Sequence, residues 1–166
     1  QRKSRVKSRR KSTFTAQSAI LVVVLFPIIK ALHELGHAYM AKAGGAEVHE
    51  LGVMLIVFLP VPYVDASASS AFREPRRRAL VGAAGIMVEL ALAALAMIAW
   101  EWLAPGLWRA AAFNVMLIGG VSTLLFNGNP LLRFDGYYVL SDLIQIPNLD
   151  TRSKQYLIYL IKRHGF

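Results

Sequence analysis

The chain has 166 residues, of which 55% are hydrophobic and only 17% are charged, and its mean hydropathy is +0.44. A soluble domain rarely combines these values, so the composition indicates an integral membrane protein. The sequence contains no cysteine, which excludes disulfides, zinc–thiolate sites and cysteine nucleophiles. Any metal ligand must therefore come from His, Asp or Glu.

The formal net charge of +9 is concentrated in two basic clusters. Seven of the 19 Lys and Arg residues lie in residues 2–11, and four lie in residues 73–78. Basic clusters beside apolar segments usually contact anionic headgroups, so membrane lipid is an expected partner and nucleic acid is not. Residues 1–14 are interpreted as a basic juxtamembrane flank.

Three segments are apolar enough to cross a bilayer as helices. Pro105 and Gly106 predict a tight turn between the second and third, and three tryptophans bracket that turn as an aromatic belt would. The predicted spans cover residues 15–43, 79–100 and 110–126.

The segments outside the spans differ from one another. Residues 47–64 are β-prone and contain two prolines near their end, which predicts a short β-hairpin or re-entrant strand at the membrane surface. Asn-Gly-Asn-Pro at residues 127–130 breaks the third span, and a short helix is expected over residues 135–146. Residues 151–166 form an amphipathic basic tail. The chain is thus predicted to be a mainly α, polytopic membrane protein with one core domain over residues 15–150.

A motif with metalloprotease spacing lies at the exit end of the first span. Residues 33–37 read His-Glu-Leu-Gly-His, an H-E-x-x-H sequence. On a helix, residues four apart share one face, so His33 and His37 can offer two imidazole nitrogens to one zinc ion. Glu34 projects beside them, where its carboxylate can deprotonate a zinc-bound water and pass the proton to the leaving amine. The motif therefore predicts a zinc site with Glu34 as the catalytic base.

A catalytic zinc site needs a third protein ligand. Because two further spans follow the motif, residues 127–135 return to the face of the membrane where His33 and His37 lie. Asp135 also precedes Gly136 at a predicted helix start, where free backbone amides favour a carboxylate. Asp135, carried by the short helix, is therefore the predicted third ligand, chosen among His49, Asp65, Glu89 and Asp135.

The other three candidates have different expected roles. Glu89 lies within the second span, where an unpaired carboxylate is costly and needs a partner. It is predicted to support the site or to pack within the protein rather than to bind the metal. His49 is expected on a surface strand and Asp65 in a loop.

Two motifs in this order and spacing resemble the site-2 protease family of intramembrane zinc metalloproteases. The first is the H-E-x-x-H sequence, and the second is Asn129-Pro130 followed by Asp135-Gly136, two spans later. The longer string over residues 127–138 is similar to a bacterial branch of peptide zinc metalloproteases linked with peptide or secretion systems. The resemblance covers about residues 15–150.

The resemblance implies roles for individual residues. His33, His37 and Asp135 match the family's zinc ligands, and Glu34 matches its catalytic glutamate. Asn129, with the neighbouring Asn127, matches a part of the site that binds substrate or the developing oxyanion. The family's strand-like element, which can pair with an extended substrate, corresponds to residues 47–64. One departure lies in residues 82–90, where many relatives carry an asparagine in a Gly-Pro motif and this chain carries Glu89.

The sequence therefore predicts a zinc-dependent intramembrane endopeptidase that hydrolyses membrane-embedded or membrane-associated peptides. Zn²⁺ is the expected cofactor, and the bacterial cytoplasmic membrane is the expected location. The main alternative is a non-proteolytic zinc-binding subunit of a peptide-export or secretion system, with components of that system as partners. A zinc transporter is less favoured, because carboxylates and histidines would then be strung through several spans rather than gathered at one end.

Overall fold

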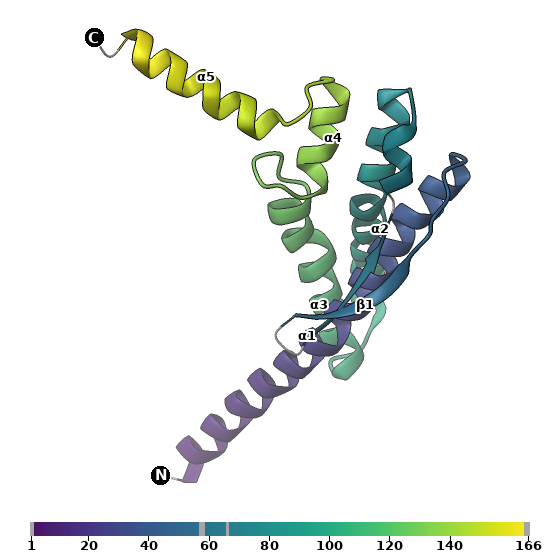
Figure 1. The fold of residues 1–166 in the computed structure, drawn as a ribbon. Helices are drawn as coiled ribbons and strands as arrows, with labels where there is room; N and C mark the ends of the chain where they lie inside the picture. Colours follow the sequence, from purple (N-terminus) through teal and green to yellow (C-terminus); the bar gives the residue numbers. More distant parts are fainter. Residues whose placement is uncertain (1, 57–58, 66, 165–166) are drawn as a thin grey trace.

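The computed structural model describes residues 2–56, 59–65 and 67–164, with side chains described over 18–55, 60–65 and 67–163. Figure 1 shows a bundle of long helices with one hairpin beside it and one helix projecting away. In chain order the elements are α1 (Arg2–Ala43), β1 (Leu51–Ile56), β2 (Leu59–Val64), the 3₁₀ helix η1 (Ser67–Ala71), α2 (Pro75–Trp102), α3 (Leu107–Met116), the π-helix η2 (Leu117–Asn127), α4 (Asp135–Leu143) and α5 (Leu149–His164).

Three helical segments have the length and hydropathy to cross a membrane: Ser18–Ala43, Pro75–Trp102 and Leu107–Asn127. Together with the two-stranded antiparallel sheet, they confirm the predicted mainly α, polytopic fold. The basic flank is helical and continues the first spanning helix, since α1 begins at Arg2.

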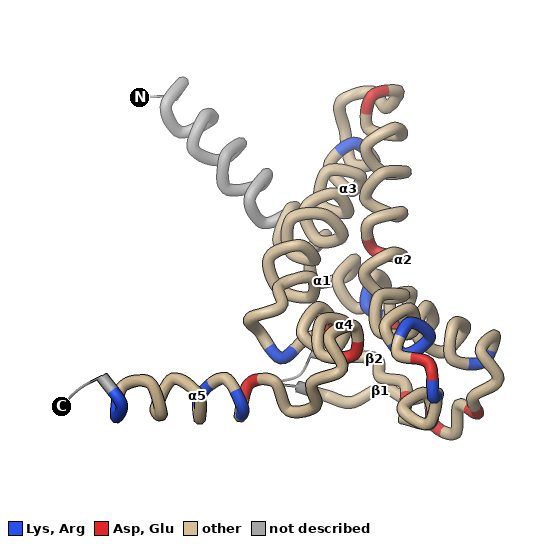
Figure 2. Tube along the Cα trace, turned by 90° about the horizontal axis from the view of Figure 1, so that it is seen from above, with Lys and Arg blue, Asp and Glu red and all other residues tan. Residues whose placement is uncertain are grey.

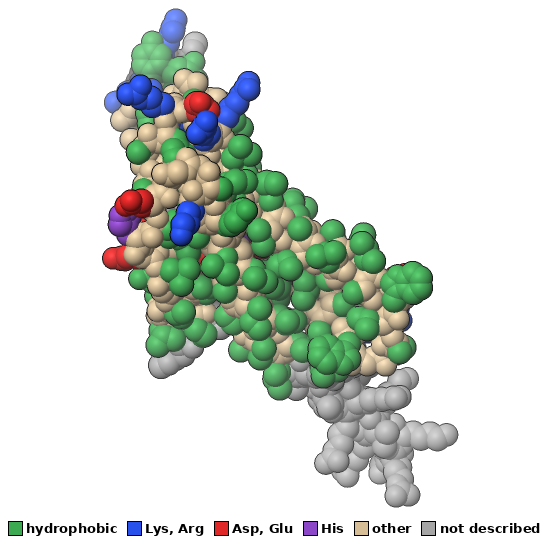
Figure 3. All heavy atoms as spheres, turned by 90° about the vertical axis from the view of Figure 1, so that its right-hand side faces the viewer, with side chains coloured by type: hydrophobic (Ala, Val, Ile, Leu, Met, Phe, Trp, Pro, Cys, Tyr) green, Lys and Arg blue, Asp and Glu red, His purple; other side chains and the backbone are tan. Residues whose placement is uncertain are grey.

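The apolar residues of the helices point largely outward, as they do in a protein surrounded by lipid. Leu95, Met97 and Ile98 of α2 are each more than half exposed, whereas the small residues Ala84 and Gly85 are buried. Small residues let helix backbones approach closely, which replaces the hydrophobic effect as the source of helix association in lipid. In the space-filling view, apolar side chains cover the middle and lower part of the molecule and charged ones gather at the upper end (Figure 3).

Helix α2 is the centre of the bundle, because it contacts α1, α3, η2 and α4. Pro75 stands in its first turn, where the missing N–H costs nothing. The third span changes its winding after Met116, and the segment that follows is a π-helix. Its end is closed by a bond from the amide of Gly128 to the carbonyl of Thr123, five residues back, at 2.8 Å.

The predicted hairpin is present, and its register pairs Leu51 with Val64 and Ile56 with Leu59. Strand β2 lies against α1, while β1 is the outer strand. Val53 of β1 is 65% exposed. The small-residue segment expected as a loop after the hairpin is the 3₁₀ helix η1, and Ala66 lies outside the described residues.

Helix α4 begins at Asp135 as predicted but ends at Leu143, before the expected residue 146. The turn that follows places Gln145 and Asn148 at positive φ, which stops the helix. Helix α5 then projects from the bundle (Figure 1). Figure 2 shows charged residues along α5 and on the loops beside the hairpin, while most of the described part of α1 to α3 is uncharged.

Candidate metal centre

Two imidazoles and one carboxylate meet where α1, α2 and α4 come together. The Nε2 atoms of His33 and His37 are 3.0 Å apart. Oδ2 of Asp135 lies 3.0 Å from Nε2 of His33 and 3.6 Å from Nε2 of His37. The side chains are 6%, 12% and 24% exposed, respectively, so the group lies inside the protein but is open on the side of Asp135.

The other nitrogen of each imidazole faces an acceptor. Nδ1 of His37 donates to the backbone carbonyl of Val81 at 2.7 Å. Nδ1 of His33 lies 3.1 Å from Oε1 of Glu89, within ion-pair distance although the contact is not aligned as a full hydrogen bond. A carbonyl or carboxylate oxygen can only accept, so the proton of a neutral imidazole belongs on Nδ1 in both rings. Both Nε2 atoms then present lone pairs to the same point.

This geometry fits a metal ion. With the proton of each ring on Nδ1, three lone pairs converge on one point, and a cation placed there would relieve their mutual repulsion. Tetrahedral zinc with bonds of about 2.0–2.2 Å sets its ligand atoms about 3.3–3.6 Å apart. The separation of 3.6 Å between His37 and Asp135 lies in that range, and the two separations of 3.0 Å that involve His33 are slightly shorter. His33, His37 and Asp135 are accordingly a group that could hold one ion.

Asp135 reaches this position because α4 starts against the break after the third span. A Cβ added at Gly136 would lie 2.6 Å from the carbonyl carbon of Gly128 and 2.9 Å from the carbonyl oxygen of Asn127, so only glycine permits the approach. Asp135 must be ionised to serve as a ligand, because a metal binds the carboxylate and not the carboxylic acid.

Glu34 lines a cavity of about 610 Å³ that also includes His37 and Asp135. The backbone amide of Val64, at the end of β2, lies beside the Glu34 carboxylate. A volume of this size accommodates a small ligand or a stretch of peptide. The remaining walls come from η1, α2 and α4 and include Ser67, Ser69, Ser70, Arg78 and Tyr138.

The sequence did not point to Gly85 as part of the site. A Cβ there would meet the imidazoles of both His33 and His37 at distances that no real contact shows. A glycine in the middle of an apolar span signals close packing in general. The sequence alone does not say that the groups packed against it are two metal ligands.

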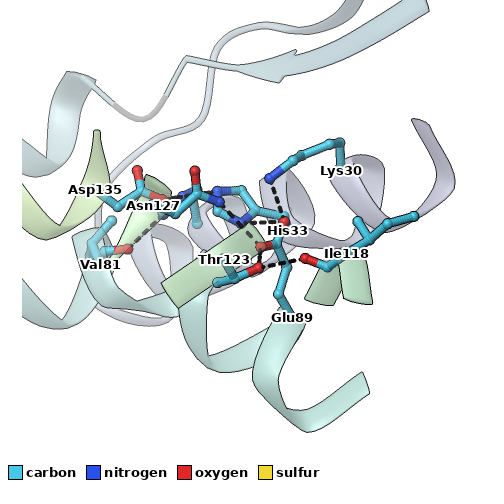
Figure 4. A network of polar contacts seen from close by, with 9 residues as sticks. Lys30, His33, Val81, Glu89, Ile118, Thr123, Asn127 and Asp135 are labelled. Carbon is cyan, nitrogen blue, oxygen red and sulfur yellow. Dashed lines mark hydrogen bonds and ion pairs between the residues drawn. The ribbon is translucent and has the colours of Figure 1, made fainter. Parts of the chain in front are cut away.

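Three further residues with predicted roles at the site, Glu89, Asn127 and Asn129, lie outside the ligand triangle. Glu89 contacts the far side of the His33 ring, away from the ligand triangle (Figure 4). The amide of Asn127 donates to Glu89 at 3.1 Å. The side chain of Asn129 accepts a bond from the amide of Leu131 at 3.0 Å, inside its own loop. Neither asparagine is among the described residues that line the cavity beside Glu34.

The two remaining candidates lie outside the group. His49 is 64% exposed and pairs with Glu47 at 3.2 Å. Asp65 accepts a bond from the amide of Ser67 at 2.9 Å, where it caps η1. His49 is at the surface as expected but lies before β1 rather than on a strand, and Asp65 lies in a loop as expected.

The comparison with known families agrees with this geometry. The profile of peptidase family M50 matches residues 20–106, more than half of the chain. The matched part contains the H-E-x-x-H motif, the hairpin and all of α2, and it ends before the segment with Asp135. No curated protein and no solved structure matches the chain. The chain is an integral membrane protein that belongs to peptidase family M50, the site-2 protease family of metalloproteases.

Proposed function

We propose that the protein is a zinc-dependent endopeptidase that hydrolyses peptide bonds of membrane-embedded or membrane-associated peptides. The observation that supports it best is the triangle of Nε2 of His33, Nε2 of His37 and Oδ2 of Asp135, with Glu34 on the wall of the adjoining cavity. A bound zinc ion would supply a water of lowered pKa and would polarise the scissile carbonyl. His33, His37 and Asp135 would hold the ion.

Proton transfer is assigned to the side chain of Glu34. Glu34 takes a proton from the attacking water and delivers it to the leaving amine, which is the task of a carboxylate placed beside but not within the ligand set. Its position next to the backbone amide of Val64 holds the carboxylate at the cavity wall.

Substrate is expected to lie extended along β2. A peptide bond within a helix has its carbonyl occupied, so a helical substrate must unwind before it is cut. Strand β2 packs against α1 and ends at Val64 on the cavity wall, where its backbone can bond an extended peptide irrespective of the peptide's side chains. Serine hydroxyls of η1 and the phenol of Tyr138 line the same space and can contact substrate side chains.

The main alternative, a zinc-binding subunit without protease activity, has less support. A structural zinc site is normally closed by four protein ligands. Among the residues that the structure describes, the group contains three: His33, His37 and Asp135. An open fourth position is the arrangement that hydrolytic zinc sites use.

The substitution Glu34→Gln tests the proposed mechanism. It keeps the size and hydrogen-bonding capacity of the side chain but removes the base, so cleavage of a panel of membrane-anchored peptides should fall by at least about 10³-fold. Zinc content, measured on the purified protein, should stay near one per chain. The matched control is Glu101→Gln, at the exposed end of α2, which should cleave at the wild-type rate. Cleavage by Glu34→Gln at the wild-type rate would contradict the mechanism.

A further inference from the structure

The carboxylate of Glu89 accepts hydrogen bonds from three side chains inside the bundle. Its side chain is fully buried. Lys30 donates to Oε1 at 2.6 Å, Asn127 donates to Oε2 at 3.1 Å, and the hydroxyl of Thr123 donates to Oε2 as well. The fourth neighbour is Nδ1 of His33, 3.1 Å from Oε1 (Figure 4). We call Lys30, Thr123 and Asn127 the Glu89 clamp.

The clamp holds the Glu89 carboxylate in one orientation, with one oxygen toward Nδ1 of His33. Three of the roughly four lone-pair directions of the carboxylate are taken by the hydrogen bonds of the clamp, and Nδ1 of His33 lies within ion-pair distance on the remaining side. Glu89 contacts Nδ1 of His33, whereas the ligand triangle uses Nε2 on the opposite side of the ring. The Glu89 carboxylate therefore contacts the imidazole of His33 but is not one of the three candidate metal ligands.

We propose that Glu89 is a positioning residue for the metal centre. It keeps the proton of His33 on Nδ1 and fixes the plane of the ring, so that Nε2 presents its lone pair toward His37 and Asp135. The inference rests on the proposed metal site and specifies how that site is built. The backbone carbonyl of Val81 orients the ring of His37 in the same way, because it accepts a hydrogen bond from Nδ1. The two imidazoles are therefore oriented by partners of unequal strength, one charged and one neutral.

The clamp also gives Asn127 a role other than substrate binding. Its amide is committed to Glu89, and the residue ends η2 immediately before the loop that leads to Asp135. Lys30, one turn before His33 on α1, approaches from the other side. Side chains of α1 and η2 thereby meet the carboxylate of Glu89, which α2 carries, on the Nδ1 side of the His33 ring.

A simpler role for Glu89 is to neutralise Lys30, whose side chain is only 18% exposed. The two roles are separable. If Glu89 serves only as a counter-ion, then removing both charges together removes the need for it. If Glu89 positions His33, then the double variant regains stability but not the affinity for zinc.

The experiment compares Glu89→Met with the double variant K30M/E89M, both in the full chain. Zinc affinity is measured by competition with a chelator, and the fold is followed by the Tm of the metal-free protein. Glu89→Met should lower both, because it leaves Lys30 buried without a partner. K30M/E89M should regain a wild-type Tm while its zinc affinity stays about 10–100-fold weak, the usual effect of losing a partner of a ligand histidine. Thr123 keeps the carbonyl of Ile118, 3.1 Å away, as an acceptor in both variants.

A spectroscopic readout separates positioning from stability. The visible absorption bands of the cobalt-substituted protein depend on ligand geometry and should differ between wild type and K30M/E89M. The matched control, Glu101→Met, removes an exposed carboxylate from the same helix and should change none of the three readouts.

Two results would overturn the inference. Zinc affinity of K30M/E89M within about twofold of wild type, with unchanged cobalt bands, would reduce Glu89 to a counter-ion and leave the proposed function standing. A wild-type protein that binds no zinc would remove the metal site itself, and the inference and the proposed function would fail together.

Discussion

His33 and His37 can lie 3.0 Å apart against α2 because the residue facing them is Gly85. The i, i+4 spacing on α1 brings the two rings to one face of the helix. It does not by itself make room for them, and a Cβ at position 85 would occupy the space of both imidazoles. The metal centre thus depends on a residue that has no side chain.

The substitution Gly85→Ala should therefore weaken zinc binding. Overpacking of a filled interior costs about 1–3 kcal/mol, and the rings at this position cannot move without leaving the ligand triangle. We expect zinc affinity to fall about 10–100-fold, measured by chelator competition.

The control for this substitution is Gly120→Ala. A Cβ at Gly120 meets only the side chain of Ala93 at 3.7 Å, an ordinary contact, so this variant should bind zinc like wild type. If both variants bind with unchanged affinity, the packing of α2 against the histidines is looser than the structure indicates.

The residues of the metal centre were predictable to different degrees. His33, Glu34 and His37 follow from one local motif, and Asp135 follows from counting spans and finding a helix start. The placement of Glu89 behind a ligand was anticipated in part, because a buried carboxylate needs a partner. Its clamp was not, since Lys30, Thr123 and Asn127 come from elements whose relative rotation no local pattern specifies. The backbone carbonyl of Val81 has no signature in the sequence.

At the scale of elements, the two outer edges of the hairpin differ. The amide of Asp65 donates to the carbonyl of Glu50 at 2.9 Å, so these two residues form a hydrogen-bonded pair. In an antiparallel ladder such pairs alternate with non-hydrogen-bonded ones. The amide of Val53 therefore points outward from β1, and that of Val64 points outward from β2. Only Val64 lies beside Glu34 and the cavity.

Proline substitutions at these two positions form a matched pair. Each removes one outward N–H and leaves the bonds between the strands in place. Val64→Pro should lower kcat/KM for extended peptides about 3–10-fold, the net value of one hydrogen bond, because it removes the N–H that lies beside the Glu34 carboxylate at the cavity wall. Val53→Pro should stay within about twofold of wild type, and both variants should keep their zinc. A loss confined to Val53→Pro would place the substrate on β1 instead.

The helical elements also differ in how far the sequence predicts them. The positions of the three spans follow from hydropathy, and the structure places each within a few residues of the predicted bounds. The π-helical winding of Leu117–Asn127 does not follow, because an apolar run of this length has the same pattern whether its backbone bonds reach back four residues or five. The end of α4 was also misjudged, since the positive φ of Gln145 and Asn148 is set by the turn into α5.

At the scale of the whole molecule, the metal centre is assembled from both halves of the chain. His33 and Asp135 are separated by more than 100 residues, and two helices that could cross the membrane lie between them. An even number of crossings is what returns Asp135 to the face of the membrane where α1 ends. In the membrane the site can form if α2 and the segment α3–η2 both span the bilayer, and it cannot form if only one of them does.

Thiol labelling tests this topology directly, because the native chain contains no cysteine. Single cysteines at Glu47, after α1, and at Arg152, in α5, occupy exposed positions and should react with a membrane-impermeant reagent from the same side of sealed vesicles. A cysteine at Ala104, in the exposed turn between α2 and α3, should react only from the opposite side. Labelling of Arg152→Cys together with Ala104→Cys, and not with Glu47→Cys, would mean that one of the two helices does not cross. Asp135 would then lie on the far face of the bilayer from the end of α1, and the three-residue metal centre could not form in the membrane.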